Sequence, residues 1–230
     1  MLLSSAARTV LRTEIPFELT AYSASVTEAR RLDERDVDRD PLVQVRRWVE
    51  DARREAVNDW DAMVVATADA SASPSARVVL LRGVDDRGLC FYSNYESRKG
   101  RELAENPRAA LVLHWREQGR QVRVTGAVSR MAAAEAVGYW DRRPRPSRLS
   151  AWASRQSQPI DGRAALEAAA EAVRSRFGDD GDVALPPFWG GYRVVPDQVE
   201  LWQHREDRLH DRLEYRRVPD GSWVLSRLQP

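Results

Sequence analysis

The 230-residue sequence predicts a mainly β protein with flanking helices. Five short segments between residues 62 and 130 are rich in Val, Leu and aromatic side chains, and turn-type residues separate them. Four more such segments follow a helical region. Short strands at this spacing, joined by hairpin-type turns, are typical of an antiparallel barrel or sandwich rather than a parallel βαβ sheet.

The first expected element is a helix that begins in "DRDPLVQVRRWVEDAR". Asp40 is a good N-cap, and Pro41 at the first helical position loses no N–H that the helix needs. An apolar stripe follows at helical spacing: Leu42, Val45, Trp48, Val49 and Ala52. Residues 1–39 show no sustained period, so we expect an N-terminal extension that is partly disordered or lies over a partner.

The strand segments come in two groups. The first group is "AMVVATA", "ARVVLLR", "LCFYS", "AALVLHW" and "QVRVTGAV", with a short helical "SRKGRELAEN" between its third and fourth members. Helices are expected in "AAAEAVGYWDRR" and "GRAALEAAAEAVRSRF". The second group is "WGGYRVV", "QVELWQ", "DRLEYRRV" and "SWVLSRL".

Composition excludes several classes of protein. No apolar run approaches the ~18 residues of a membrane span, and we expect a cytoplasmic protein. A net charge of +1 argues against nucleic acid as a partner. The single cysteine, Cys90, excludes an internal disulfide, and three scattered histidines give no metal-ligand spacing. Lys99 is the single lysine among 36 basic residues.

Motifs for nucleotide binding or for hydrolysis are absent from the sequence. There is no P-loop, no G-x-G-x-x-G after a strand and no G-x-S-x-G. An enzyme with this sequence should therefore depend on an organic cofactor, for which the protein supplies anion sites and flat contacts.

Two stretches carry groups that favour phosphate. Arg77 and Arg82 stand at the two ends of one strand segment, and Arg98 and Lys99 fall in the first turn of the short helix. Helix-start N–H groups and two cations favour a phosphate. A second, Pro-interrupted stretch adds further basic and polar side chains: Arg143, Ser147, Gln156 and Ser157.

The stretch "LWQHREDRLHDRL" near the C-terminus alternates with period two. As a strand it would place Arg208, His210 and Arg212 on one face, and Leu209, Asp211 and Leu213 on the other. Two interpretations stay open at this point: a solvated edge strand blunted by charge, or one wall of a pocket for an anion and a flat ring.

The motifs together resemble the pyridoxine/pyridoxamine 5′-phosphate oxidase family. The resemblance runs from about Pro41 to Pro230 and rests on "RVVLLR", "FYSNYESRKG", "GRQVRVTG", "YWDRRPRPSRLSAWASRQS", "PFWGGYRV" and "ELWQHREDRLHDRLEY…RLQP". It implies a split β-barrel that binds FMN at the interface of a homodimer. The implied organisation is an N-terminal extension (1–39), an FMN-binding split barrel with helical segments (40–188), and C-terminal strands for dimerisation and the active site (189–230).

The resemblance also implies the site residues. FMN is assigned Arg77, Val78, Val79, Leu80, Leu81, Arg82, Tyr92, Ser93, Arg98, Lys99, Gln121, Gln156, Ser157, Trp202 and Arg212. The substrate phosphate is assigned Arg82, Tyr139, Arg143 and Ser147. Arg208 and His210 are the expected catalytic residues over the substrate ring, and His210 is the one suited to exchange a proton near neutral pH. No metal is expected.

The implied activity is oxidation of pyridoxamine or pyridoxine 5′-phosphate to pyridoxal 5′-phosphate, with O₂ reduced to H₂O₂. One alternative is a related flavin oxidase of phenazine biosynthesis, acting on a reduced aromatic substrate. Another is a non-catalytic module that binds FMN or nucleic acid. The sequence departs from the family at Arg82, where a Lys is usual, at His114, and at His204-Arg205, and it lacks the N-terminal Arg-x-x-Tyr segment.

Overall fold

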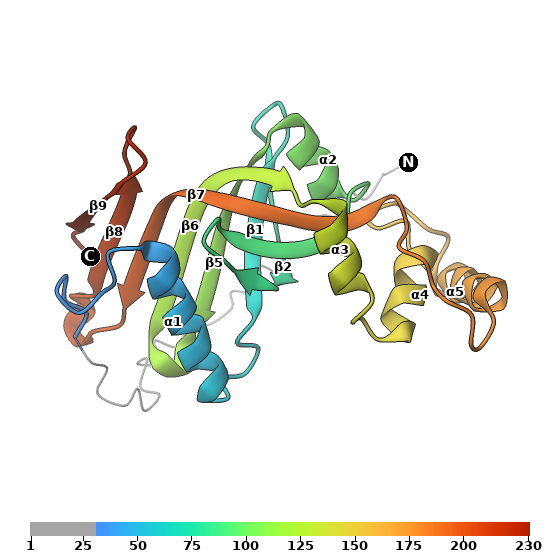
Figure 1. Ribbon diagram of the computed structural model, residues 1–230, viewed down its shortest axis with the longest axis horizontal. Coiled ribbons are helices and arrows are strands. Elements are labelled where there is room, and N and C mark those ends of the chain that lie inside the picture. Colours follow the sequence, from blue (N-terminus) through green and yellow to red (C-terminus); the bar gives the residue numbers. More distant parts are fainter. Residues whose placement is uncertain (1–30) are drawn as a thin grey trace, which may run out of the picture.

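The structure is a computed structural model that describes residues 31–230, and its strands form one antiparallel sheet (Figure 1). The strands are β1 (Ala62–Ala68), β2 (Pro74–Leu80), β3 (Gly83–Val84), β4 (Leu89–Asn94), β5 (Arg108–Trp115), β6 (Arg120–Arg130), β7 (Trp189–Gln203), β8 (Asp211–Arg217) and β9 (Trp223–Arg227). Their order is β2-β1-β5-β6-β7-β4-β3, with β8 pairing to β7 and β9 to β8. The expected mainly β fold is confirmed.

The helices flank this sheet. They are α1 (Pro41–Arg54), α2 (Arg98–Glu105), α3 (Ala133–Trp140), α4 (Arg145–Ala153) and α5 (Arg163–Phe177), with 3₁₀ helices at Arg116–Gln118 and Glu206–Arg208. The predicted start of α1 is confirmed, because the Asp40 side chain accepts a hydrogen bond from the N–H of Leu42. In α4 the proline of the Pro-interrupted stretch, Pro146, sits in the first turn, where a helix tolerates it.

Strand β7 holds the sheet together. It pairs with β6 along its length, while its other edge pairs with β4 through residues 189–194 and with β8 through residues 198–203. The sequence analysis expected two strands here, "WGGYRVV" and "QVELWQ". The structure instead has one strand, since the register shifts where Gly126 of β6 opposes Pro196. A Cβ on Gly126 would lie 2.1 Å from the Val195 carbonyl oxygen, so this close approach requires glycine.

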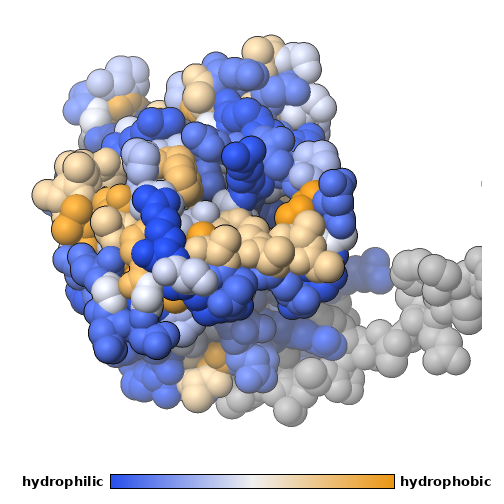
Figure 2. All heavy atoms as spheres, turned by 90° about the vertical axis from the view of Figure 1, so that its right-hand side faces the viewer, coloured by the Kyte–Doolittle hydropathy of each residue, from blue (hydrophilic) through white to orange (hydrophobic). Residues whose placement is uncertain are grey.

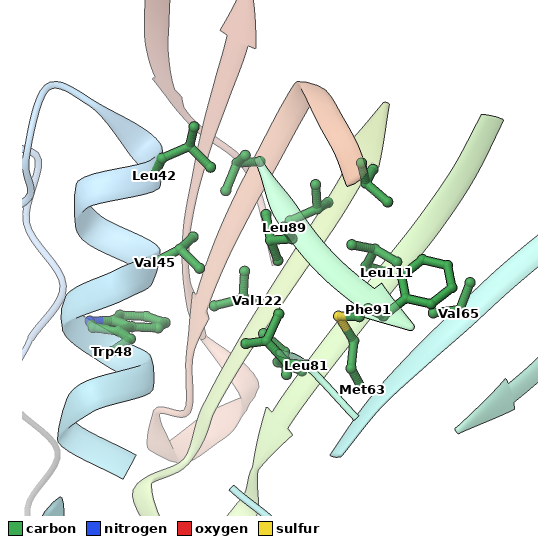
Figure 3. Packing of buried hydrophobic residues seen from close by; sticks show 14 of the residues in the cluster. Leu42, Val45, Trp48, Met63, Val65, Leu81, Leu89, Phe91, Leu111 and Val122 are labelled. Atoms are coloured by element: carbon green, nitrogen blue, oxygen red, sulfur yellow. The ribbon is translucent and has the colours of Figure 1, made fainter. Parts of the chain in front are cut away.

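The main hydrophobic core lies between α1 and the sheet (Figure 3). Leu42, Val45 and Trp48 point from the helix toward the strands, as the predicted apolar stripe requires. A second, smaller core around Trp140, Val183 and Trp189 anchors α3 and α4 beyond the end of the sheet. Figure 2 faces the end of the molecule formed by α4 and α5, where apolar atoms form a band between hydrophilic side chains.

Only part of the predicted N-terminal extension lies within the described residues. That part packs on the C-terminal strands: the Leu32 N–H donates to a carboxylate oxygen of Asp211, and Arg227 donates to the Leu32 carbonyl. Residues 1–30, which make up the greater part of the extension expected to be partly disordered, lie outside the described residues. From residue 31 onward, no helix is long and apolar enough to cross a membrane.

Candidate active site

A cavity of about 880 Å³ opens between the edge strand β2, the start of α2, and helices α3 and α4. Most residues predicted for cofactor and substrate phosphate line it: Arg77, Val78, Val79, Leu80, Arg82, Tyr92, Ser93, Arg98, Lys99, Tyr139, Arg143, Ser147, Gln156 and Ser157. Leu81 does not, because its side chain belongs to the main core. The tertiary structure thus brings together residues that are up to 80 positions apart in the chain.

Strand β2 supplies an apolar floor to this cavity. Its residues alternate between exposed and half-buried, and Val78 and Leu80 are 64% and 45% exposed. Exposed apolar side chains are unusual on an edge strand, because such an edge tends to associate with other protein chains. The floor is therefore suited to a flat, partly apolar ligand or to a partner.

Three of the lining residues, Arg77, Arg98 and Lys99, form a basic cluster beside the start of α2. Lys99 is 6% exposed, and its ammonium donates to Ser93 Oγ at 3.0 Å, Gln156 Oε1 at 3.0 Å and Ser97 Oγ at 3.3 Å. Burial, together with the nearby Arg77 charge, lowers the pKa of Lys99 to about 8. An anion bound here would favour the charged ammonium.

Glu102, on α2, lies behind the basic cluster and was not singled out from the sequence. Its buried carboxylate accepts hydrogen bonds from the hydroxyls of Thr67 and Ser75, from Arg77 NH2 at 3.2 Å and from Arg98 Nε at 2.8 Å. Burial alone would raise its pKa, but these donors hold the pKa at about 2. Glu102 is therefore ionised, and the cluster with its carboxylate carries a formal charge of +2.

A second group of residues that line the same cavity, the Tyr139 cluster, consists of Arg82, Tyr139, Arg143 and Ser147. Arg82 Nε donates to the Tyr139 hydroxyl at 2.9 Å. The Tyr139 ring stacks on Tyr92 with centroids 4.0 Å apart, which fixes the hydroxyl in place.

Arg143 is the member of the Tyr139 cluster whose hydrogen-bond donors are least fully paired. Its guanidinium lies 4.7 Å from the centroid of the Trp189 ring, and NH2 donates to the Ser147 carbonyl at 3.1 Å. Its buried Nε has no hydrogen-bond partner among the described residues. Burial lowers the pKa of Arg143, as expected for a cation without a carboxylate partner. An anion in the cavity would satisfy both its charge and its spare donor.

The remaining predicted residues form a C-terminal set outside this cavity: Gln121, Trp202, Arg208, His210 and Arg212. Gln121 of β6 lies opposite Trp202 of β7, which lies opposite Arg212 of β8, so the three share one face of the sheet. Arg212 Nε donates to the buried carboxylate of Glu200 at 2.8 Å. In Figure 1, strand β8, which carries Arg212, lies at the opposite end of the molecule from α3 and α4, which contribute lining residues to the cavity.

The expectation that Arg208, His210 and Arg212 alternate along one strand is wrong. β8 begins only at Asp211, and the Glu206–Arg208 segment is a 3₁₀ helix that ends with Arg208 at a φ of +61°. A tight turn and a left-handed residue break the period-two pattern, so Arg208 and His210 stand in the connection before the strand. Arg208 is exposed there.

His210 is held in a defined tautomer. The backbone N–H of Arg205 donates to His210 Nδ1 at 3.1 Å, so Nδ1 is an acceptor and the neutral ring carries its proton on Nε2. The ring packs on Trp202, with centroids 4.6 Å apart, and on His204, at 5.2 Å. Burial, with the nearby His204 and Arg208, lowers the pKa of His210, so the neutral form dominates at neutral pH.

Comparison with known families agrees with this site. Residues 49–177 match the family model described as pyridoxamine 5′-phosphate oxidase, and residues 189–230 match the pyridoxine 5′-phosphate oxidase C-terminal dimerisation region. A pyridoxine/pyridoxamine 5′-phosphate oxidase of Ralstonia nicotianae is 53% identical over 199 residues, covering 86% of this chain and 93% of the relative. A Salinibacter ruber protein of the same name is 50% identical, covering 83% and 89%.

Solved structures show the same fold. The crystal structure of PhzG from Burkholderia lata, in complex with tetrahydrophenazine-1-carboxylic acid, superposes with a TM-score of 0.80 at 33% identity, covering 88% of this chain and all of that one. An FMN-binding protein of Nostoc punctiforme superposes at 0.66 and 18% identity, covering 83% and 98%. The sheet and its structural neighbours define a protein with the split β-barrel fold. The chain belongs to the pyridoxamine 5′-phosphate oxidase family.

Several cavity residues were not predicted as site residues: Asn94, Pro146, Ser150, Ala151, Ser154 and Trp189. Trp189 belongs to "PFWGGYRV", one of the motifs that resemble the family, but the resemblance assigned no role to this tryptophan. Its ring lies between the Tyr92 stack and the Arg143 guanidinium. The sequence feature that could have indicated a role for Trp189 in the site is its position at the start of a strand, directly before two glycines.

Proposed function

We propose that this protein is an FMN-dependent oxidase that converts pyridoxamine 5′-phosphate or pyridoxine 5′-phosphate to pyridoxal 5′-phosphate and reduces O₂ to H₂O₂. The observation that carries the proposal is that one cavity is lined by two groups of basic and hydroxyl side chains, each of which could bind an anion: Arg77, Arg98 and Lys99, and the Tyr139 cluster. A phosphorylated cofactor and a phosphorylated substrate would each require one such group of side chains to bind its phosphate. The relatives named as pyridoxine/pyridoxamine 5′-phosphate oxidases support this reading.

The basic cluster fits the FMN phosphate. Arg77, Arg98 and Lys99 with the Glu102 carboxylate sum to +2, which matches a phosphate monoester near its second ionisation. Charge-assisted hydrogen bonds of this kind each contribute about 1.5–3 kcal/mol. The exposed Val78 and Leu80 of β2 would then lie under the flavin and lose their contact with water.

The Tyr139 cluster fits the substrate phosphate. Arg82, Tyr139, Arg143 and Ser147 would bind it, and the spare Nε of Arg143 would gain a partner. These contacts lie away from the reacting carbon, so they use binding energy to place the substrate rather than to change its chemistry.

We further propose a homodimer in which the C-terminal set of one chain completes the cavity of its partner. The match of residues 189–230 to a dimerisation region supports this. So does the position of Gln121, Trp202 and Arg212 on one sheet face, away from the cavity of their own chain.

Bound FMN would supply the redox chemistry, by accepting a hydride from the substrate 4′-carbon and returning the electrons to O₂. With the amine substrate, one water would also be consumed and ammonia released, whereas the alcohol substrate would need neither. The protein's contribution is placement. Arg208 would orient the amine or alcohol of the substrate, and His210 would hold a proton at Nε2 beside it because Nδ1 is occupied by the Arg205 N–H. Substrate and cofactor are phosphorylated metabolites of the cytoplasm, which is where we place the enzyme.

The test is anaerobic bleaching of the bound flavin. Purified protein loaded with FMN should lose its yellow absorbance with either vitamer phosphate and recover it with O₂, releasing one H₂O₂ per product. The structural similarity to PhzG favours one rival, an oxidase of reduced phenazine-type substrates. Bleaching by a dihydroaromatic acid but by neither vitamer phosphate would establish that rival. Flavin that binds and is bleached by no substrate would indicate a non-catalytic module.

A further inference from the structure

We propose that Glu102 is a positioning residue that holds Arg77 and Arg98 in the orientation in which they bind the cofactor phosphate. The inference rests on the proposed FMN site. Four donors from three elements converge on this one carboxylate: Thr67 of β1, Ser75 and Arg77 of β2, and Arg98 of α2.

The two arginines need such a constraint for different reasons. The Arg98 side chain is 56% exposed, so without a partner it would sample many rotamers in water. Its salt bridge to Glu102 spans one helical turn and directs the guanidinium along α2. Arg77 is 21% exposed, and its NH2 is shared between Ser75 Oγ and Glu102.

Ser75 and Thr67 bind both the carboxylate and Arg77. Each hydroxyl donates to Glu102, and each accepts from the Arg77 guanidinium. The network therefore holds Arg77 through the Glu102 carboxylate itself and through two hydroxyl oxygens that Glu102 holds in place. Removing the carboxylate would release both arginines and leave two hydroxyl donors without their acceptor.

Loss of the carboxylate charge has two opposite effects on phosphate binding. A buried anion repels a phosphate, so neutralising it should tighten binding if charge alone matters. Loss of orientation should weaken binding, because the free arginines must be ordered by the ligand. The sign of the change in FMN affinity therefore separates a positioning role from a merely electrostatic one.

The experiment is a flavin-fluorescence titration of the full-length, flavin-free protein with FMN and with riboflavin, which lacks the phosphate. For Glu102→Gln we expect the Kd for FMN to rise roughly 10-fold or more, as for one to two lost charge-assisted contacts. The Kd for riboflavin should stay unchanged. An FMN Kd equal to or below that of the wild type would overturn the proposal, and so would an equal loss for riboflavin.

Glu105→Gln is the matched control, since it removes the same charge from the same helix at an exposed position outside the network. It should bind FMN as the wild type does. Glu102→Asp keeps the negative charge but shortens the side chain by one methylene group. It replaces Glu102→Gln as the test if the Gln variant does not fold. Positioning predicts weaker FMN binding for the Asp variant, whereas wild-type affinity would contradict it.

A double-mutant cycle with Arg98→Gln tests whether Glu102 affects FMN binding through Arg98. If Glu102 acts partly through Arg98, the Gln substitution at 102 should cost less affinity in the Arg98→Gln background than in the wild type. Full additivity would remove Arg98 from the proposal. If the wild-type protein does not bind FMN, the proposed function itself is wrong. This outcome differs from failure of the Glu102 proposal, in which the wild type binds FMN but the Glu102 variants bind it equally well.

Discussion

Arg82 donates from Nε to the Tyr139 hydroxyl at 2.9 Å and from NH1 to the Asp61 carboxylate, so one guanidinium joins Tyr139 of α3 to the residue that precedes β1. A lysine, usual at this position in the family, has one compact ammonium and could not present two donors in fixed directions. The arginine therefore fixes the Tyr139 hydroxyl as well as contributing charge to its cluster.

This relationship predicts the effect of Tyr139→Phe. The ring would keep its stack on Tyr92, but Arg82 would lose one acceptor and the substrate phosphate one donor. We expect the KM for the vitamer phosphate to rise about 3- to 10-fold, with kcat changed less, as for one net hydrogen bond of about 0.5–1.5 kcal/mol. Steady-state kinetics measures this. Tyr215→Phe, which removes a hydroxyl bonded to the Asp38 carbonyl, should leave KM alone.

Lys99 predicts a pH dependence of FMN binding. Its pKa is about 8 in the free protein, and a bound phosphate should raise that value because it favours the ammonium. Above pH 8 binding must then take up a proton, so FMN affinity should fall as pH rises from 8 toward 10. Titration calorimetry in buffers of different ionisation heat measures the uptake. In Lys99→Met the proton uptake should vanish, and its persistence would assign the effect to another group.

Arg143 and Arg208 predict different kinetic losses. Arg143→Ala removes a cation from the Tyr139 cluster and should chiefly raise KM, roughly 10- to 100-fold for a charged contact. Arg208→Ala should lower kcat by a similar factor while FMN stays bound, because Arg208 is assigned to the substrate ring and is not part of the basic cluster proposed to bind the FMN phosphate. Stopped-flow flavin reduction separates the two. Loss of flavin in Arg208→Ala would contradict the assignment.

The same two variants test whether the site is shared between chains. Mixing and re-forming Arg143→Ala and Arg208→Ala dimers would create one unaltered site in each heterodimer if the C-terminal set acts on the partner's cavity. Activity should then recover to about a quarter of the wild type for random mixing. Mixtures no more active than the separate variants would place both residues in a site within one chain.

Asp40 predicts a change in stability alone. Its carboxylate caps α1 through the Leu42 N–H at 2.8 Å, and α1 covers the main core. Asp40→Ala should lower the free energy of unfolding by about 0.5–2 kcal/mol without changing flavin affinity. Urea unfolding measures this, with Asp86→Ala, at an exposed turn position, as the control. A drop no larger than that of the control would mean that the cap is dispensable.

Much of this protein follows from local sequence. The start of α1 was predictable because Asp40 and Pro41 act within one turn of the helix they begin. The strands from β1 to β6 were predictable, apart from the two-residue β3, because alternating apolar residues and turn residues act over short distances. The family motifs named most lining residues of the cavity, since each motif is a short segment with a fixed conformation.

Other features were decided only by tertiary contacts. Glu102 became part of the site because Thr67, Ser75 and Arg77, distant in sequence, meet its carboxylate in a buried place where an ionised group needs donors. β7 runs through Pro196 because Gly126 lets the neighbouring strand approach. The turn before β8 overrode a period-two pattern, since a strand forms only where backbone partners exist, and pairing with β7 stops at Asp211.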